Sequence, residues 1–460
     1  MEKLLRLAKD SWVLFSRIRR RQDFFKYCTA LLLLVIPLYP KFPLFGVPGT
    51  HVAIRIEDFV IAVIAVIWFW DILRHEYKTF FKDRINQAIL LFLFVGFLSV
   101  ISAIFITRSV SWHLALLHWA RRIEYLIPFF VAITAIKRGA KPLFFVEVLL
   151  ISSFIAFLFG WGQIHAGFPV ISTQNEEYAK GLALRWIPGS RLHSTFAGHY
   201  DLAAFLVLVF PIVVAYFFTI QRLINRFWKF LFFLVPSFWL FLQTESRVSF
   251  ISYMLATALT LWVIKKRRFI APMILLSILG MFLLSDLGAR YWRTIKVYTQ
   301  KVSWETFQAA RPVFAEEDRR VPRVLAIVED RSTSIRFNVE WPRAFRSFFK
   351  NPLLGTGFSS ITLATDSDYL RLLGEVGIVG TLAFLLVIMR ILEVLTAFLR
   401  KVQRLNIEKA FIGGFVGSLA GLLVTAFFID VFEASKVAIV FWTLAGIAVG
   451  TAKKETEAHV

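Results

Sequence analysis

Long apolar runs follow one another along almost the whole chain, and short polar loops separate most of them. About twelve of these runs are close to the twenty residues that a helix needs to cross a bilayer. The pattern therefore predicts an all-α polytopic membrane protein with about twelve transmembrane helices. The predicted spans are 24–44, 57–73, 87–107, 115–136, 142–164, 198–219, 227–244, 247–264, 269–286, 369–393, 408–429 and 434–451.

Two loops are much longer than the others, at 165–197 and 287–368. They predict three parts: an N-terminal transmembrane bundle over 1–286, a partly helical loop over 287–368, and three C-terminal spans over 369–460. We expect the last part to pack on the same bundle as the first.

The end of the second long loop has the pattern of an amphipathic helix. At about 100° per residue, a charged stripe backs onto an aromatic one. The charged stripe holds Arg336, Glu340 and Arg343, and the aromatic stripe holds Phe337, Trp341, Phe345 and Phe348. Pro342 is expected to kink or restart this helix, and Asn351-Pro352 to end it. Such a helix suits a membrane surface, with its charges facing water.

Composition supports the membrane class. Of the 460 residues, 58% are hydrophobic and 50 are Phe, which argues against a large soluble helical protein. Cys28 is the one cysteine, so an intrachain disulfide and a multi-cysteine metal cluster are both excluded.

The net charge of +22 raises the question of nucleic acid, but its distribution favours a membrane. Most basic residues lie in short loops that fall on one side if the spans alternate, as the positive-inside bias produces. This predicts that both termini are cytoplasmic and that the two long loops face the other side. The arginines of the second long loop, Arg290 among them, need another explanation.

The first candidate site is the segment 185–201, which brings Arg185, Arg191, His193, His199 and Asp201 to the mouth of a span. Arginine pairs well with anionic oxygens, so these residues are candidates for binding phosphate and sugar. Alternatively, the segment is an interfacial loop with snorkelling arginines.

The second candidate is Arg247, in the short Thr244–Arg247 hairpin between two spans. Such a hairpin holds the arginine near the membrane surface, where it can bind a diphosphate. It can equally pair with Glu245 or anchor a helix end.

The third candidate is Arg336 with Arg343, and the fourth is the segment Asp366-Ser367-Asp368-Tyr369. The default interpretation of Arg336 is a charge on a solvated helix face. An aspartate beside a span is either a general base or a helix cap, and each role can fall to a different residue.

Charges also lie inside predicted spans. The spacing of Arg121, Arg122 and Glu124 allows an ion pair within one helix, and we expect a structural role for them. Alternatively, they line a path for lipid phosphates. Glu375 shares a helix face with three glycines that predict close packing: Gly374, Gly377 and Gly380.

Several catalytic motifs are missing from the sequence. It has no phosphate-binding glycine loop with its lysine, no zinc-type histidine pair on a helix, no nucleophile-elbow serine and no obvious acidic metal triad. We therefore expect neither a cofactor nor a metal, and a substrate that is already activated.

The order of the four candidate places resembles the bacterial O-antigen ligase and polysaccharide polymerase superfamily. The resemblance rests on these segments: Arg191-Leu-His-Ser-Thr-Phe-Ala-Gly-His-Tyr-Asp-Leu-Ala, Thr244-Glu-Ser-Arg247, Arg336 with Trp341 and then Asn351-Pro-Leu-Leu-Gly-Thr-Gly, and Asp366-Ser-Asp-Tyr-Leu followed by Gly374-Glu-Val-Gly-Ile-Val-Gly. It covers 185–395 by motif and the whole chain by topology. One departure is that the ligases typically carry a His-Asn pair where this chain has Asp366-Ser367.

The resemblance implies a metal-independent glycosyltransferase of cell-surface polysaccharide biosynthesis, multi-pass in the bacterial inner membrane, with its active site facing the periplasm. The donor would be a glycan on undecaprenyl diphosphate and the acceptor a saccharide or glycolipid, with membrane lipids around them and no nucleic acid. The resemblance also allows contacts with other polysaccharide assembly proteins. The departure at Asp366-Ser367 favours a polymerase over a lipid A-core ligase.

The roles implied for single residues fall into two groups. Arg191, Arg247, Arg336 and Arg185 would bind the diphosphate; Asp366, His199 and His193 are the candidate catalytic residues. The alternatives are a transporter or flippase of lipid-linked glycans, which should carry its charges near mid-bilayer, and a noncatalytic assembly factor.

Overall fold

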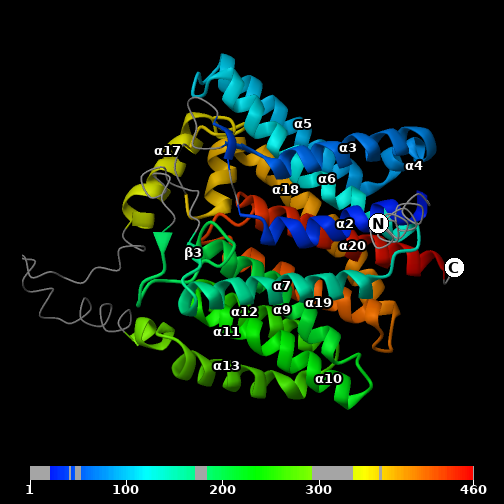
Figure 1. Ribbon diagram of the computed structural model, residues 1–460. Helices are drawn as coiled ribbons and strands as arrows, with labels where there is room; N and C mark the ends of the chain where they lie inside the picture. The colour runs from blue at the N-terminus through cyan, green and yellow to red at the C-terminus, as the bar shows by residue number, and fades with distance from the viewer. Residues whose placement is uncertain are drawn as a thin grey trace, which may run out of the picture.

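The computed structural model describes residues 21–40, 43–46, 53–170, 184–292, 335–361 and 365–458. Most of the predicted loop 287–368 lies outside them. In the described part, helices run side by side between two ends of a bundle (Figure 1). Two short antiparallel strand pairs accompany them, β1 (Pro43–Gly46) with β2 (Ala53–Arg55) and β3 (Pro169–Val170) with β4 (Leu184–Arg185).

The helices are α2 (Arg21–Leu38), α3 (Ile56–His75), α4 (Tyr77–Lys82), α5 (Arg84–Phe105), α6 (Trp112–Lys137), α7 (Pro142–His165), α9 (His199–Phe217), α10 (Leu223–Lys229), η1 (Phe230–Leu234), α11 (Val235–Gln243), α12 (Arg247–Val263), η2 (Arg267–Phe269), α13 (Ile270–Leu284), η3 (Arg336–Glu340), α17 (Trp341–Lys350), α18 (Asp368–Lys401), α19 (Ile407–Thr425) and α20 (Ser435–Ala458). Helices dominate because a chain in lipid must satisfy its backbone hydrogen bonds internally.

Each predicted span falls on one of these helices. Within the described residues, 8 helical segments are long and apolar enough to cross a membrane: α5, α7, α9, α10 to α11, η2 with α13, α18, α19 and α20. The other predicted spans coincide with α2, α3, α6 and α12. The all-α polytopic membrane class is confirmed, while the total of about twelve spans stays a prediction.

The centre of the bundle is formed by α9 and α20. Their apolar windows are 89% and 100% buried, whereas those of α10 to α11 and of η2 with α13 are 11% and 17% buried. Small residues let backbones approach here. A Cβ on Gly446 of α20 would lie 2.2 Å from the carbonyl oxygen of Phe129 on α6, so a larger residue would force these helices apart.

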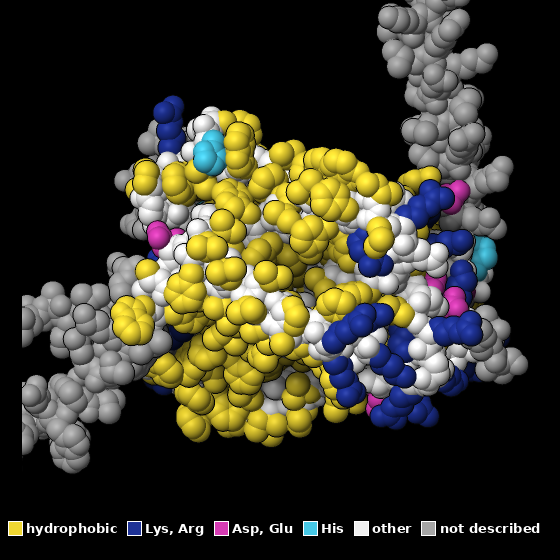
Figure 2. Space-filling model, turned by 90° about the horizontal axis from the view of Figure 1, so that it is seen from below, with side chains coloured by type: hydrophobic (Ala, Val, Ile, Leu, Met, Phe, Trp, Pro, Cys, Tyr) yellow, Lys and Arg dark blue, Asp and Glu magenta, His cyan; other side chains and the backbone are white. Residues whose placement is uncertain are grey.

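The outer surface is suited to a bilayer. Seen from below, apolar side chains cover the flank, and most of the visible Lys and Arg side chains gather at the end where both termini lie (Figure 2). The turn Lys265–Arg268 before α13 contributes to this basic end. A single basic end is what the positive-inside bias produces.

The helix α18 is broken where a loop enters it. Gly377 has φ 66°, outside the helical region, and divides α18 into two helices. The loop 351–357 fills the break through backbone bonds: Thr356 N to Gly374 O (2.9 Å), Gly357 N to Glu375 O (2.8 Å) and Ile378 N to Pro352 O (2.8 Å). The close packing predicted from the glycines is confirmed: a Cβ on Gly377 would lie 2.3 Å from Leu353 O of the loop, and one on Gly374 would lie 3.1 Å from Ala344 O of α17. The predicted span 369–393 coincides with α18, and the break at Gly377 was not predicted.

The predicted amphipathic helix is present as η3 followed by α17. Pro342 lies in the first turn of α17, directly after η3, and the helix ends at Lys350 before Asn351-Pro352. Both predicted boundaries are confirmed. The prediction that the charged stripe faces water is wrong for Arg336, whose side chain is buried.

Candidate active site

The loop between β4 and α9 is held in place by its Ser-Thr-Phe segment. The hydroxyl of Ser194 donates to Ala156 O on α7 (2.5 Å), and the hydroxyl of Thr195 donates to Pro37 O on α2 (2.8 Å). Phe196 is fully buried. This segment therefore acts as an anchor, and it fixes the positions of the residues on either side of it, Arg191 and His199.

A buried lysine supports the same loop. Lys436, in the first turn of α20, is 1% exposed, and its ammonium donates to Thr195 O (2.8 Å) and Pro37 O (3.1 Å). Carbonyl oxygens and the ring of Phe196, 4.9 Å away, compensate the buried charge. No motif or spacing in the sequence connects this lysine with the loop.

Two of the predicted arginines meet at Tyr200. The guanidinium carbons of Arg191 and Arg336 lie 5.9 and 5.8 Å from the centre of the Tyr200 ring. Arg191 also donates from Nη1 to Nε2 of His199 at 2.7 Å. Because arginine can only donate, Nε2 of His199 is the acceptor here. This geometry suits His199 for holding Arg191 in place.

Arg336 forms an ion pair with Asp366. Its Nε and Nη2 both lie 2.9 Å from Oδ2 of the carboxylate. Burial raises the pKa of Asp366, the Arg336 charge opposes that rise, and Asp430 adds to it; the balance is an increase. Asp366 has φ 47°, a left-handed conformation that is costly for most side chains other than glycine, Asn and Asp.

A second carboxyl group lies next to this pair. Burial, together with the negative charge of Asp366, raises the pKa of Glu340 to about 7. Its Oε2 is buried and has no hydrogen-bond partner among the described residues. A carboxyl group that titrates near neutral pH can exchange protons in a reaction. The helical pattern had placed Glu340 on a solvated face.

His193 lies beside His199, with ring centres 5.9 Å apart and planes nearly parallel. Burial lowers the pKa of His193, Asp201 opposes this change and Arg191 adds to it, so the imidazole is neutral at neutral pH. Its Nδ1 is buried and has no hydrogen-bond partner within the described part of the chain. Arg185, by contrast, is exposed on β4.

The turn that carries Arg247 lies against the same loop. Leu192 N donates to Gln243 O at 3.0 Å, which brings the start of α12 beside the segment that follows Arg191. Tyr291 donates to the carbonyl oxygen of Arg247 at 2.5 Å. Whether the Arg247 side chain joins Arg191 and Arg336 at a ligand stays a prediction.

A further arginine enters the site from the chain that follows α13. Arg290 pairs with Glu245 at 2.8 Å and lies within electrostatic range of His199. The sequence singled out Arg290 only as one of many loop arginines. The position of Arg290 in the sequence does not predict that it lies near Glu245 and His199.

Behind the site, charged side chains from three segments pair with one another. Arg371 of α18 contacts Asp430 (2.9 Å) and Glu375 (3.4 Å). Arg122 of α6 contacts Glu433, which lies between α19 and α20, and Glu375 at 3.9 Å. The sequence spacing allowed Arg122 to pair with Glu124 within α6. Arg122 instead pairs with carboxylates from other segments, which compensate its buried charge. These pairs are consistent with the predicted structural role.

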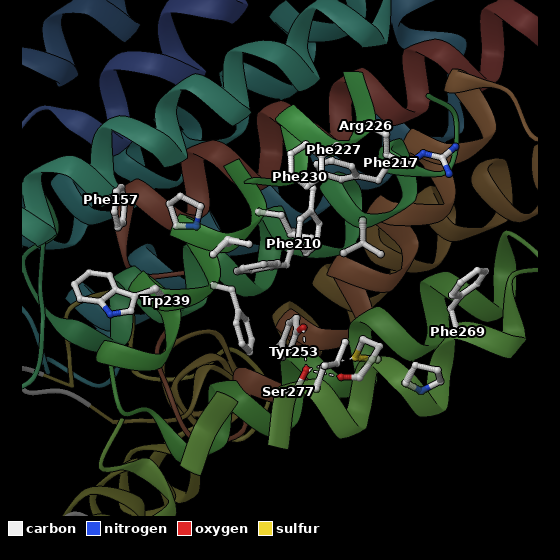
Figure 3. Close-up of a pocket in the computed structure, with 18 of the residues that line it drawn as sticks. Phe157, Phe210, Phe217, Arg226, Phe227, Phe230, Trp239, Tyr253, Phe269 and Ser277 are labelled. Atoms are coloured by element: carbon white, nitrogen blue, oxygen red, sulfur yellow. Dashed lines mark hydrogen bonds between the residues drawn. The ribbon is translucent and has the colours of Figure 1, made fainter. Parts of the chain in front are cut away.

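An apolar cavity of about 1070 Å³ opens among α7, α9, α10 to α13 on the flank of the bundle (Figure 3). Aromatic rings such as Phe210, Phe217 and Phe230 line it. Tyr253 of α12 also lines it and hydrogen-bonds Ser277 at 3.2 Å. Arg247 begins the same helix, so α12 runs from the charged site along the cavity wall. Across the described ranges, no three His, Cys, Asp or Glu side chains form a group that could hold a metal ion.

Fold and site together define a multi-pass membrane protein with arginine, histidine and carboxyl side chains gathered at one end of its helix bundle. Residues 231–385 match the family model described as O-antigen ligase, and this stretch contains Arg247, Arg336 and Asp366. This match supports the O-antigen ligase and polymerase superfamily, and it confirms the resemblance seen in the sequence. The family indicates a glycosyltransferase-like enzyme. A search of curated proteins found no match.

Proposed function

We propose that this protein transfers a glycan from undecaprenyl diphosphate to a saccharide hydroxyl at the periplasmic face of the bacterial inner membrane, in the synthesis of a cell-surface polysaccharide. The observation that carries the proposal is the meeting of Arg191 and Arg336 at Tyr200, with the Asp366 carboxylate on Arg336. Two arginines and a carboxylate at one point supply anion binding and a proton acceptor.

In the proposed reaction, the acceptor oxygen attacks the anomeric carbon of the donor sugar. The bond from that carbon to the phosphate oxygen breaks, and undecaprenyl diphosphate leaves with the electron pair. Arg191 and Arg336, joined by Arg247 and Arg185, stabilise the negative charge on the leaving diphosphate. The acceptor hydroxyl gives its proton to Asp366, or to the neutral imidazole of His193.

The lipid part of the donor is expected to lie in the apolar cavity, because α12 connects the charged site with the cavity wall. An aromatic-lined space open to the bilayer stabilises a long hydrocarbon chain by burial. The donor would then bind with its diphosphate at the bundle end and its chain along the flank.

A polymerase is preferred to a lipid A-core ligase because Asp366-Ser367 stands where the ligases typically have His-Asn. The test uses the purified protein in liposomes with undecaprenyl-diphosphate-linked glycan and a saccharide acceptor, with products sized on a gel. Progressive lengthening supports a polymerase. A single addition to lipid A core indicates a ligase. Absence of product contradicts transfer and favours transport of the lipid-linked glycan.

A further inference from the structure

The carboxylate of Asp430, in the middle of the α19–α20 connection, binds the backbone on both sides of Asp366. Its Oδ2 accepts from Thr365 N at 3.0 Å, and its Oδ1 accepts from Ser367 N at 2.9 Å. The residue between these two amides is Asp366, in its left-handed conformation. Each oxygen of one side chain thus fixes one flank of the site aspartate.

The α19–α20 connection is bound in the same way by a carboxylate of the loop 365–368, that of Asp368. Oδ2 of Asp368 accepts from Val431 N at 2.7 Å and from Phe432 N at 3.1 Å. Asp368 therefore binds the two amides that follow Asp430, while Asp430 binds amides that precede Asp368. We call this exchange between the loop 365–368 and the connection the carboxylate clasp.

Asp430 is itself held by a buried arginine. Arg371 contacts its Oδ2 at 2.9 Å, and the two side chains are 13% and 14% exposed. Arg371 is on the second turn of α18 and also pairs with Glu375. Asp430 is therefore tied to α18, and so is the loop that it binds.

We propose that Asp430 is a positioning residue, which holds Asp366 through its flanking amides so that the Asp366 carboxylate faces Arg336. The inference rests on the proposed function, in which Asp366 receives the acceptor proton. Asp430 contacts the backbone and Arg371, so its effect reaches the reaction through Asp366.

The charges that face Asp366 come from three elements: Arg336 and Glu340 on η3, Arg371 on α18, and Asp430 on the connection. Of these, Asp430 raises the pKa of Asp366 through its negative charge. Loss of that charge lowers the pKa of Asp366, so the base stays ionised to a lower pH. The acid limb of the pH–rate profile then moves to lower pH.

The test compares Asp430→Asn with Asp71→Asn in the liposome transfer assay. Asp71 is matched because it is also 14% exposed and also pairs with an arginine, Arg138, between α3 and α6. Asp430→Asn is expected to lower kcat on the order of a hundredfold, as misplacement of a reacting group does, with the donor KM nearly unchanged. The acid limb moves to lower pH, Asp430→Glu recovers part of the rate, and Asp71→Asn keeps the parent rate and profile.

Amide hydrogen exchange provides a readout that does not depend on glycan transfer. Asp430→Asn is expected to accelerate exchange at Thr365 and Ser367, and Asp71→Asn to leave it unchanged. Unchanged exchange in Asp430→Asn overturns the clasp. Faster exchange with full turnover in Asp430→Asn overturns the positioning role. A loss of turnover that is fully explained by a smaller amount of folded protein overturns it as well. If the wild-type protein transfers no glycan, the proposed function fails, and the exchange data still decide whether Asp430 holds the loop.

Discussion

At the scale of single residues, the site depends on which partner each charged group finds. Arg336 and Asp366 were both predicted as candidates, since their residue types suit anion binding and proton transfer. Helical periodicity assigned Arg336 to a face but did not say what covers that face, so its burial against Asp366 and Tyr200 was not predictable. Tyr200 carried no signal of its own in the sequence.

The role of Asp366 can be tested by substitution with asparagine, which tolerates the same left-handed conformation. Asp366→Asn is expected to lower turnover by about 10² to 10⁴, the usual contribution of a general base. Burial raises the pKa of Asp366, so the parent rate falls on the acid side at a pH above the ordinary aspartate value of about 3.9. Measurement of kcat/KM against pH is expected to show that limb lost in Asp366→Asn.

Glu340→Gln is the control for this profile, since Glu340 also titrates nearby. It should keep the acid limb that belongs to Asp366. Wild-type turnover in Asp366→Asn would assign the base to another group, with His193 the next candidate. Loss of the limb in Glu340→Gln instead would assign it to Glu340.

At the scale of elements, local signals were reliable and long-range ones were not. Pro342 and Asn351-Pro352 fixed the ends of α17, because proline restricts the backbone wherever it occurs. The glycines around Glu375 predicted a close approach, but the same spacing fits either an intact helix against a neighbour or a break filled by a loop. In the structure the helix is broken, and backbone hydrogen bonds between 351–357 and 374–379 fill the break. The glycine spacing alone does not predict these bonds.

The proposal that the lipid chain of the donor lies in the cavity can be tested at two leucines of α13. Leu276 lines the cavity and is 64% exposed, while Leu279 is 50% exposed and is not part of the lining. Leu276→Trp is expected to fill part of the cavity and raise the donor KM several-fold, because an indole displaces the lipid chain. Leu279→Trp should leave KM unchanged. Equal KM values for both variants and the parent would place the chain elsewhere.

At the scale of the whole molecule, hydrophobic patterning predicted the fold class and the location of nearly every helix. It did not predict how the helices pair, because partners such as Arg122 and Glu433 are separated by 311 positions along the chain. Most of the basic side chains visible on the flank gather at the end where the termini lie, and the candidate site lies at the other (Figure 1, Figure 2). From this we predict cytoplasmic termini and a periplasmic site.

Orientation is tested with single cysteines in a Cys28→Ala background. Ile187→Cys lies on the site end and Leu223→Cys on the basic end, and both parent residues are well exposed, at 65% and 76%. A membrane-impermeant thiol reagent should label Ile187→Cys in intact spheroplasts and Leu223→Cys only after the membrane is opened. The reverse pattern would place the site in the cytoplasm.

The most direct measurement of the central claim, that arginines at one end of the bundle bind the leaving diphosphate, is the transfer rate of Arg336→Ala beside Arg346→Ala. Arg336 is buried on Asp366, and Arg346 is exposed on the neighbouring helix α17, so the pair separates a site arginine from a surface arginine. In liposomes with the lipid-linked donor, folded Arg336→Ala is predicted to lose glycan transfer while Arg346→Ala keeps the wild-type rate. Transfer by Arg336→Ala at the wild-type rate would contradict the account.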